Sequence, residues 1–128
     1  MFQQPEILAT ASALARHSSQ RQSLVAENIA NADTPGYRSR DLDDFAALFE
    51  SGSGFDLRAT RPSHRILAGG TAAPMRVIEA GGSMSPNGND VSLEDEMLRA
   101  ASIRQDHDLA LAVYRASLGI LRTSLGRV

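Results

Sequence analysis

The sequence predicts a mainly α-helical protein, with long N- and C-terminal helices that pair as a coiled coil and an irregular middle segment containing short β-strands. Apolar residues recur at alternating spacings of three and four near both ends of the chain, which is the coiled-coil pattern. Glycine and proline are concentrated in the middle. With 128 residues, the chain has room for one domain at most.

The N-terminal part, residues 1–33, is predicted to be one helix that continues to about Ala32. From Pro5 onward it is rich in alanine and contains neither glycine nor an internal proline. Two of its eight seam positions are polar and several others are alanine, so this helix is expected to need a partner in water. The N-terminal seam comprises Leu8, Ala11, Ala15, Val25 and Ile29.

The C-terminal part, residues 91–128, carries a stronger helix signal. Eight of ten positions at strict four-three spacing are apolar. Ser92-Leu-Glu-Asp95 has the form of a capping box, and acidic residues follow in the first turn, where the helix dipole favours them. A helix of this length spans roughly 50 Å and requires another long helix to cover it. The larger seam residues are Leu93, Met97, Leu111, Tyr114, Leu118, Leu121 and Leu125.

The middle of the chain, residues 34–90, is predicted to be an extended insert and not an independent domain. Residues 41–49 favour one or two helical turns. Residues 55–60 and 75–80 alternate in polarity, which is typical of short strands, and they can pair as one hairpin. Glycine pairs beside them indicate turns.

The sequence shows no pattern typical of catalysis or metal binding. Cysteine is absent, and the three histidines lack the spacing of a metal site. The stretch from Ser83 to Glu94 has the glycine and final glutamate of a calcium-binding loop, but serines replace its first two carboxylates. Pairs such as Asp43–Asp44 are best explained as solvated charges. We therefore expect no catalytic residue, no cofactor and no metal.

Charge and hydropathy argue against two further classes. The chain has 13 basic and 15 acidic residues, a net charge of −2 and no basic run, so nucleic-acid binding is not expected. No stretch approaches the roughly 18 apolar residues of a transmembrane helix. The first positive charge, Arg16, is not followed by the apolar run of a cleavable signal peptide.

The stretch NIANADTPGYRSRD, residues 28–41, predicts the end of the first helix and a tight turn. A residue before proline is pushed out of the α region, so the helix is expected to end near Ala32 or Asp33. Pro35 and Gly36 suit the second and third positions of a type II turn, where the glycine takes positive φ.

The same stretch holds more polar residues than the end of a helix needs. Asn28 and Asn31 are poor helix formers, and their amides can bond backbone across a packed interface. We expect them, together with Tyr37 and residues 38–41, to contact neighbouring subunits. The full motif comprises Asn28, Ile29, Ala30, Asn31, Asp33, Thr34, Pro35, Gly36 and Tyr37.

Residues 28–45, NIANADTPGYRSRDLDDF, resemble the N-terminal signature of the flagellar rod, hook and filament-junction proteins. These proteins share the pattern Asn-Ile-Ala-Asn-x-x-Thr-Pro-Gly-Tyr after an N-terminal helix. Two later stretches, ATRPSHRI at 59–66 and SPNGNDVSLEDEML at 85–98, are similar to the proximal rod members of this family.

The resemblance implies a structural protein without catalytic activity, whose terminal helices are unstable alone and pair in the inner layer of a hollow tube. It implies a basal-body rod subunit that transmits torque and encloses the export channel in the periplasmic space. The implied partners are further copies of the chain, the rod proteins FlgC and FlgF, the adaptor FliE and the ring protein FliF.

The resemblance also implies delivery by the flagellar type III export apparatus, without a cleaved signal peptide. Phe45 and Phe49 fit the Phe-x-x-x-hydrophobic pattern by which rod and hook substrates are recognised at the export gate. An aromatic pair on the buried face of a short helix explains these two residues equally well. The competing function for the whole chain is a small cytoplasmic coiled-coil adaptor or export chaperone, which binds partner helices in a groove.

Overall fold

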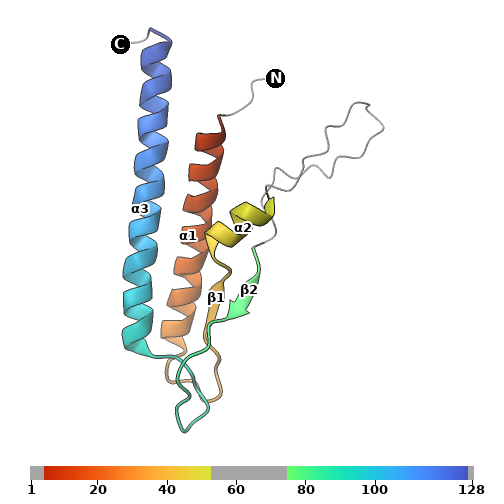
Figure 1. Ribbon diagram of the computed structural model, residues 1–128. Coiled ribbons are helices and arrows are strands. Elements are labelled where there is room, and N and C mark those ends of the chain that lie inside the picture. Colours follow the sequence, from red (N-terminus) through yellow and green to blue (C-terminus); the bar gives the residue numbers. More distant parts are fainter. Residues whose placement is uncertain (1–4, 53–74, 127–128) are drawn as a thin grey trace.

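A computed structural model describes residues 5–52 and 75–126, and two long antiparallel helices dominate it (Figure 1). Helix α1 spans Glu6–Ala30 and helix α3 spans Leu93–Ser124. They lie side by side, and the C-terminal end of α3 reaches past the start of α1 (Figure 1). The predicted fold class, a mainly helical chain with paired terminal helices, is confirmed.

Helix α1 begins directly after Pro5, whose backbone is extended at φ −55° and ψ 136°. Its last helical residue is Ala30, two positions before the predicted end. Asn31 caps the helix, and its N–H donates to the carbonyls of Glu27 and Asn28 at 3.1 Å. The chain then continues in turns to Gly36, so the proline restricts a turn and not the helix itself.

Helix α3 begins where the capping box predicts. The Ser92 hydroxyl accepts a hydrogen bond from the Asp95 N–H at 3.3 Å, which satisfies one of the free donors at a helix start. With 32 residues, α3 is roughly 48 Å long.

The middle of the chain contributes a two-stranded sheet and a short helix. Strand β1, Arg40–Leu42, pairs antiparallel with strand β2, Val77–Glu79, and Asp41 lies opposite Ile78. The strand predicted at 75–80 is therefore present, but its partner is β1, which was not predicted. The other predicted strand, 55–60, lies outside the described residues. Helix α2, Phe45–Gly52, follows β1, so the helical turns predicted over 41–49 are present but begin at Phe45.

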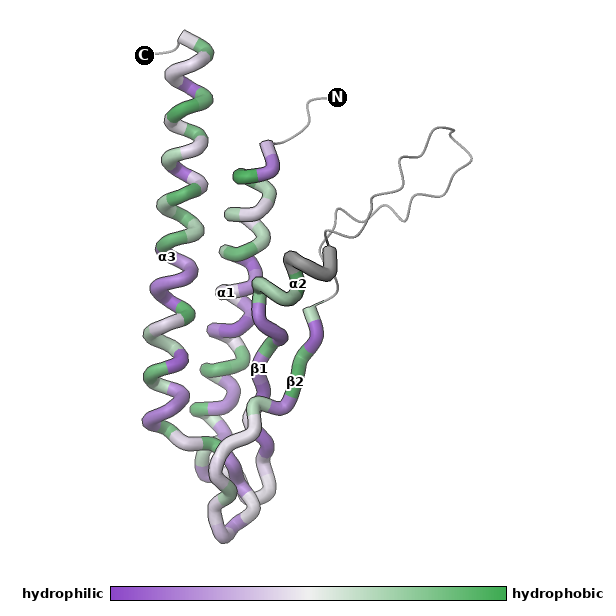
Figure 2. The backbone as a smooth tube through the Cα atoms, viewed as in Figure 1, coloured by the Kyte–Doolittle hydropathy of each residue, from purple (hydrophilic) through white to green (hydrophobic). Residues whose placement is uncertain are grey.

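The buried part of the molecule is small and unusually polar. Its buried apolar residues are Leu8, Ala11, Val25, Leu42, Ile103 and Ala110. Within residues 5–52 and 75–126, nine polar or charged side chains are buried as well, most of them where the helices meet the sheet and the loops. Figure 2 shows hydrophilic residues on α1 and α3 in the part of each helix that lies at the height of β1 and β2. Side-chain hydrogen bonds and ion pairs therefore have to hold this region together.

The residues that α3 buries differ from the predicted seam by one position. They are Glu96, Ile103, Ala110 and Ser117, spaced by seven. The prediction favoured the neighbouring positions 97, 104, 111 and 118, because apolar content was the criterion. The buried positions include a glutamate, a serine and an alanine, so apolar content alone does not identify the face of α3 that is buried within the single chain.

None of the helices in the described ranges is long and apolar enough to cross a membrane.

Candidate functional site

The turn predicted after α1 is present. The Tyr37 N–H donates to the Thr34 carbonyl at 3.3 Å, and Gly36 has a φ of +73°. A type II turn has this bond and this positive φ at its third residue. A Cβ at Gly36 would meet no described atom within 4 Å beyond its neighbours in sequence, so backbone conformation and not space requires the glycine.

Asn28 lies at the centre of a polar cluster that joins α1, β1 and α3. Its side chain is 0% exposed. The amide Nδ2 donates to the Arg40 carbonyl at 2.8 Å and to Glu96 Oε2 at 3.2 Å. Its Oδ1 accepts from the Arg40 N–H at 3.0 Å and from the Tyr37 hydroxyl at 3.2 Å. We name this cluster the polar clasp; it comprises Arg21, Asn28, Tyr37, Arg40, Asp41, Glu96 and Arg99.

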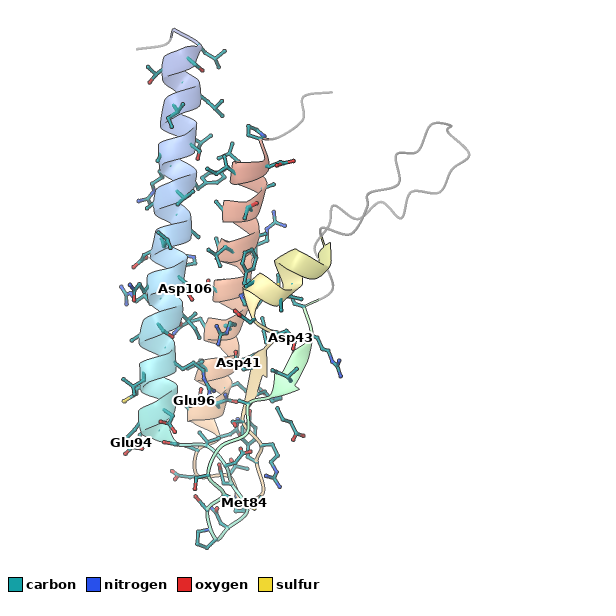
Figure 3. All side chains as sticks on the ribbon, in the orientation of Figure 1. Asp41, Asp43, Met84, Glu94, Glu96 and Asp106 are labelled. Atoms are coloured by element: carbon teal, nitrogen blue, oxygen red, sulfur yellow. The ribbon has the colours of Figure 1, made fainter. Side chains whose placement is uncertain are left out.

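Ion pairs complete the polar clasp. Arg21 of α1 holds Asp41 of β1 through two bonds, Nε to Oδ1 at 2.8 Å and Nη2 to Oδ2 at 2.6 Å, which is bidentate geometry. Arg99 of α3 lies 3.8 Å from Asp41 Oδ2 and donates to Glu96 Oε1 at 2.5 Å. Figure 3 shows Asp41 and Glu96 at this level, on β1 and α3. Both carboxylates are buried, so each depends on its arginine.

Burial and hydrogen bonds shift the pKa values of Asp41, Arg21 and the nearby Asp90. Burial opposes the ionisation of Asp41, but the hydrogen bonds and charge of Arg21 outweigh it and hold the pKa of Asp41 below its ordinary value. The same bond raises the pKa of Arg21. Burial also opposes the ionisation of Asp90, and hydrogen bonds from Ser39 keep its pKa below the ordinary value. All three groups are therefore charged at neutral pH.

A loop before α3 closes the end of α1. Asn89 is 1% exposed, and its Nδ2 lies 2.8 to 2.9 Å from the carbonyl oxygens of Asn31, Ala32 and Thr34. These carbonyls belong to the C-cap residue of α1 and to the turn that follows it. One buried side-chain amide thus joins that turn to the loop before α3.

The same loop also bonds the segment that leads into β1. The Gly36 N–H donates to the Asn87 carbonyl at 3.1 Å, and the Ser39 N–H donates to Asp90 Oδ1 at 2.6 Å. Sequence reasoning missed the roles of Asn89 and Asp90. Both lie in the stretch 85–98 that resembles proximal rod proteins, which is the signal that could have singled them out.

The expected contact of Asn28 with neighbouring subunits is wrong, because its side chain is used entirely within the chain. Asn31 is half-buried, and its Nδ2 donates to the Glu27 carbonyl at 2.8 Å. Residues 38–41 are likewise engaged internally: Arg38 pairs with Asp90, and Arg40 pairs with Glu27. Asn28 and Arg38 thus bind distant parts of one chain to each other, whereas Asn31 bonds within the end of its own helix.

The predicted seam residues are only partly covered in the single chain. On α1, Leu8, Ala11 and Val25 are buried, and Ala15 and Ile29 are half-buried. On α3 the half-buried seam residues are Leu111, Tyr114 and Leu118, and the exposed ones are Leu93, Met97, Leu121 and Leu125.

Phe45, one of the two candidate export residues, begins α2 and is half-buried. Its ring centroid lies 5.5 Å from that of His17, which is itself buried and has Nε2 2.8 Å from the Asp43 carbonyl. The Phe49 side chain lies outside the described part. The described residues contain no group of three His, Cys, Asp or Glu side chains that could hold a metal ion.

The fold and the polar clasp define a structural helical protein, whose most elaborate group of side chains holds its own elements together. Comparison with known proteins agrees with this class. The family model for the flagella basal body rod protein matches residues 7–38, which include most of α1 and the turn.

Three relatives carry the same description. The chain is 30% identical to the flagellar basal body rod protein FlgB of Agrobacterium fabrum over 115 residues, 87% of this chain and 86% of that protein. It is 33% identical to FlgB of Salmonella typhimurium over 108 residues, 77% and 78% of the two chains. A shorter match to FlgB of Escherichia coli is 71% identical over 24 residues, 19% and 17% of the two chains. The chain belongs to the FlgB family and is a structural component of the flagellar basal-body rod.

Proposed function

We propose that this chain is a proximal rod subunit whose α1–α3 pair joins those of its neighbours in a hollow helical tube. The observation that carries this proposal is the apolar surface that α3 leaves uncovered. Met97, Leu98, Ile120 and Leu125 are 61%, 72%, 70% and 81% exposed. Large exposed apolar surfaces mark sites of association. The cytoplasmic adaptor is not favoured, because the relatives that match over most of the chain are rod proteins.

The polar clasp suits a subunit that transmits torque around an export channel. Sliding α1 along α3 would separate Asn28 from Glu96 and leave a buried carboxylate without its amide donor. Rotating β1 away would break the bidentate pair between Arg21 and Asp41. Both losses are costly in a buried site, so the subunit resists internal shear and passes the load to its neighbours.

For partners, we propose further copies of this chain, FlgC and FlgF along the rod, and FliE and FliF at its base. The rod lies in the periplasmic space, and the chain reaches it through the flagellar type III apparatus without a cleaved signal peptide. Phe45 and Phe49 serve as the export signal before folding, since Phe45 packs beside His17 in the folded chain.

Complementation of a strain that lacks the gene tests the proposal. Leu118→Asp places a charge on the half-buried α3 seam. We expect the variant to be expressed and, as circular dichroism of the purified protein would show, folded. We expect it to be absent from isolated basal bodies, and the cells not to swim. Gln20→Asp, on the exposed face of α1, is the control and is expected to swim normally. Normal incorporation of Leu118→Asp would contradict the proposed packing, and wild-type protein found only in the cytoplasmic fraction would favour the adaptor.

A further inference from the structure

The α1–α3 pair has one side covered by the sheet and one open side. On the covered side, Arg21 of α1 and Arg99 of α3 both reach Asp41 of β1. The open side holds a groove of about 490 Å³ between the two helices. The residues that line it are Ser18, Ser19, Gln22, Ser23, Ala26, Ile103, Arg104 and His107. Most of these side chains are polar, and covering them costs free energy unless they find partners, so the groove suits a polar occupant.

Two polar groups of the groove have no partner in the described part of the chain. Arg104 is exposed and forms no ion pair there, not even with Asp108, one turn further along α3. Ser18 is 2% exposed, and its hydroxyl forms no hydrogen bond with another described residue. In the described ranges no fully sealed side-chain N or O atom lacks a partner, so the Ser18 hydroxyl reaches the groove. Both groups are therefore free to donate to a bound molecule.

The groove carries positive charge and no negative charge. Arg104 brings a guanidinium to the α3 wall, and no acidic residue lines either wall. Ser18 and Ser19 bring hydroxyl donors to the α1 wall. A carboxylate held between the walls would accept charge-assisted hydrogen bonds from the guanidinium and further bonds from the hydroxyls. The groove therefore favours an acidic side chain as its occupant.

Apolar residues continue the α3 wall at both ends of this polar stretch. Met97 and Leu111 lie seven residues before and after Arg104, and Tyr114 lies seven residues after His107. A spacing of seven returns a helix to nearly the same face. Met97 is 61% exposed, and Leu111 and Tyr114 are half-buried, so all three are open to a further contact. Along α3 the open face is thus apolar, then polar, then apolar, which suits a third helix with the same order.

We propose that the open face binds a helix of a neighbouring rod subunit, whose apolar seam is interrupted by one aspartate or glutamate. That carboxylate lies between Arg104 and the hydroxyls of Ser18 and Ser19. Sliding the incoming helix by seven residues would place its carboxylate against Met97 or Leu111 and leave it without a cation. A single polar position in an apolar seam fixes register in coiled coils in the same way. This inference rests on the proposed function and states the chemistry of one contact between subunits.

Substitutions at Arg104 test the charge, because this residue has no ion-pair partner to lose in the described chain. Each variant is expressed in cells that lack the gene, and its amount in isolated basal bodies is measured. We expect Arg104→Glu to reduce incorporation by about tenfold or more, since like charges repel, and Arg104→Gln to reduce it less. Thermal melts of the purified variants are expected to match that of the natural chain.

Arg16→Glu, on the exposed surface of α1 and outside the groove, is the matched control and is expected to be incorporated normally. Incorporation of Arg104→Glu at the level of the natural chain, or an equal loss for Arg16→Glu, would overturn the inference. Natural protein absent from basal bodies would contradict the proposed function instead.

Photocrosslinking identifies the occupant independently of these variants. A benzophenone amino acid replaces Ser23, which is exposed and lines the groove, and intact basal bodies are irradiated. We expect an adduct whose cross-linked peptide, identified by mass spectrometry, contains an aspartate or glutamate. The adduct mass shows whether the occupant is a second copy of the 13.7 kDa chain or another rod protein. A cross-linked peptide without a carboxylate, or no adduct from basal bodies that contain the variant, would overturn the inference.

Discussion

The Asn28 side chain joins α1, β1 and α3 because an amide both donates and accepts hydrogen bonds. Its partners include a backbone N–H, a backbone carbonyl, a phenol and a carboxylate. An aspartate of the same shape would lose both donors and place a second negative charge beside Glu96. This position therefore requires an amide.

Replacing Asn28 with alanine tests this role. In Asn28→Ala, buried Glu96 and the Arg40 backbone lose a partner, and we expect the free energy of unfolding to fall by about 2–3 kcal/mol. Asn31→Ala removes the same chemical group at a half-buried site, and a loss below about 1 kcal/mol is expected. Urea unfolding of both variants provides the measurement. Equal losses would mean that the burial of Asn28 has no energetic importance.

The sequence identifies Asn28 as unusual but does not identify its partners. A poor helix former near a helix end is visible locally, whereas Glu96 lies 68 residues further along. Asn89 is harder still to predict, because an asparagine in a Gly-rich loop is ordinary, and only the fold brings it to the carbonyls at the exit of α1. Long-range polar contacts are thus the part of the site that local patterns leave out.

Among the elements, the turn after α1 depends on Gly36. Gly36→Val puts a β-branched residue at φ +73°, and we expect a loss of about 1–2 kcal/mol in the free energy of unfolding and loss of swimming. Gly36→Asn is the matched variant, since asparagine tolerates this conformation. It should retain most of the free energy of unfolding and most of the swimming. Thermal melts and swimming assays measure the two effects. A Val variant as stable as the natural chain would indicate that the turn adopts another geometry.

Local signals predicted where the helices start and end better than which faces they bury. Ser92 and Gly36 act through their own neighbours, so the α3 start and the turn could be predicted. The rotation of α3 could not, because Glu96 is a buried glutamate whose partner on α1, Asn28, is distant in sequence. Strand β1 was missed for the same reason: its central residue, Asp41, is charged and becomes a buried strand residue only through Arg21 and Arg99.

For the whole molecule, the polar clasp predicts sensitivity to acid. The pKa values of Asp41 and Asp90 lie below their ordinary value in the folded chain. Their ionisation therefore contributes stability above the unfolded pKa of about 3.9, and this contribution is lost as the pH falls through the folded pKa values. We expect thermal stability to change little between about pH 7 and 5 and to fall below about pH 4.

Asp41→Asn separates this effect from general acid unfolding. The variant should be less stable at neutral pH, because Arg21 loses its charged partner, and its stability should depend less on pH below about 4. Circular dichroism melts across this range compare the two slopes. An unchanged slope would show that other carboxylates govern the acid transition.

The unequal lengths of the two long helices have a mechanical consequence. Helix α3 has seven more residues than α1 and, at about 1.5 Å per residue, projects roughly 10 Å beyond it. Asn28 and Glu96 lie level at the other end, so the whole offset falls at the end where the chain terminates (Figure 1). In a rod built from such subunits, the ends of α1 and α3 lie at different heights along the rod. The boundaries between successive subunits therefore do not all fall in one plane across the rod.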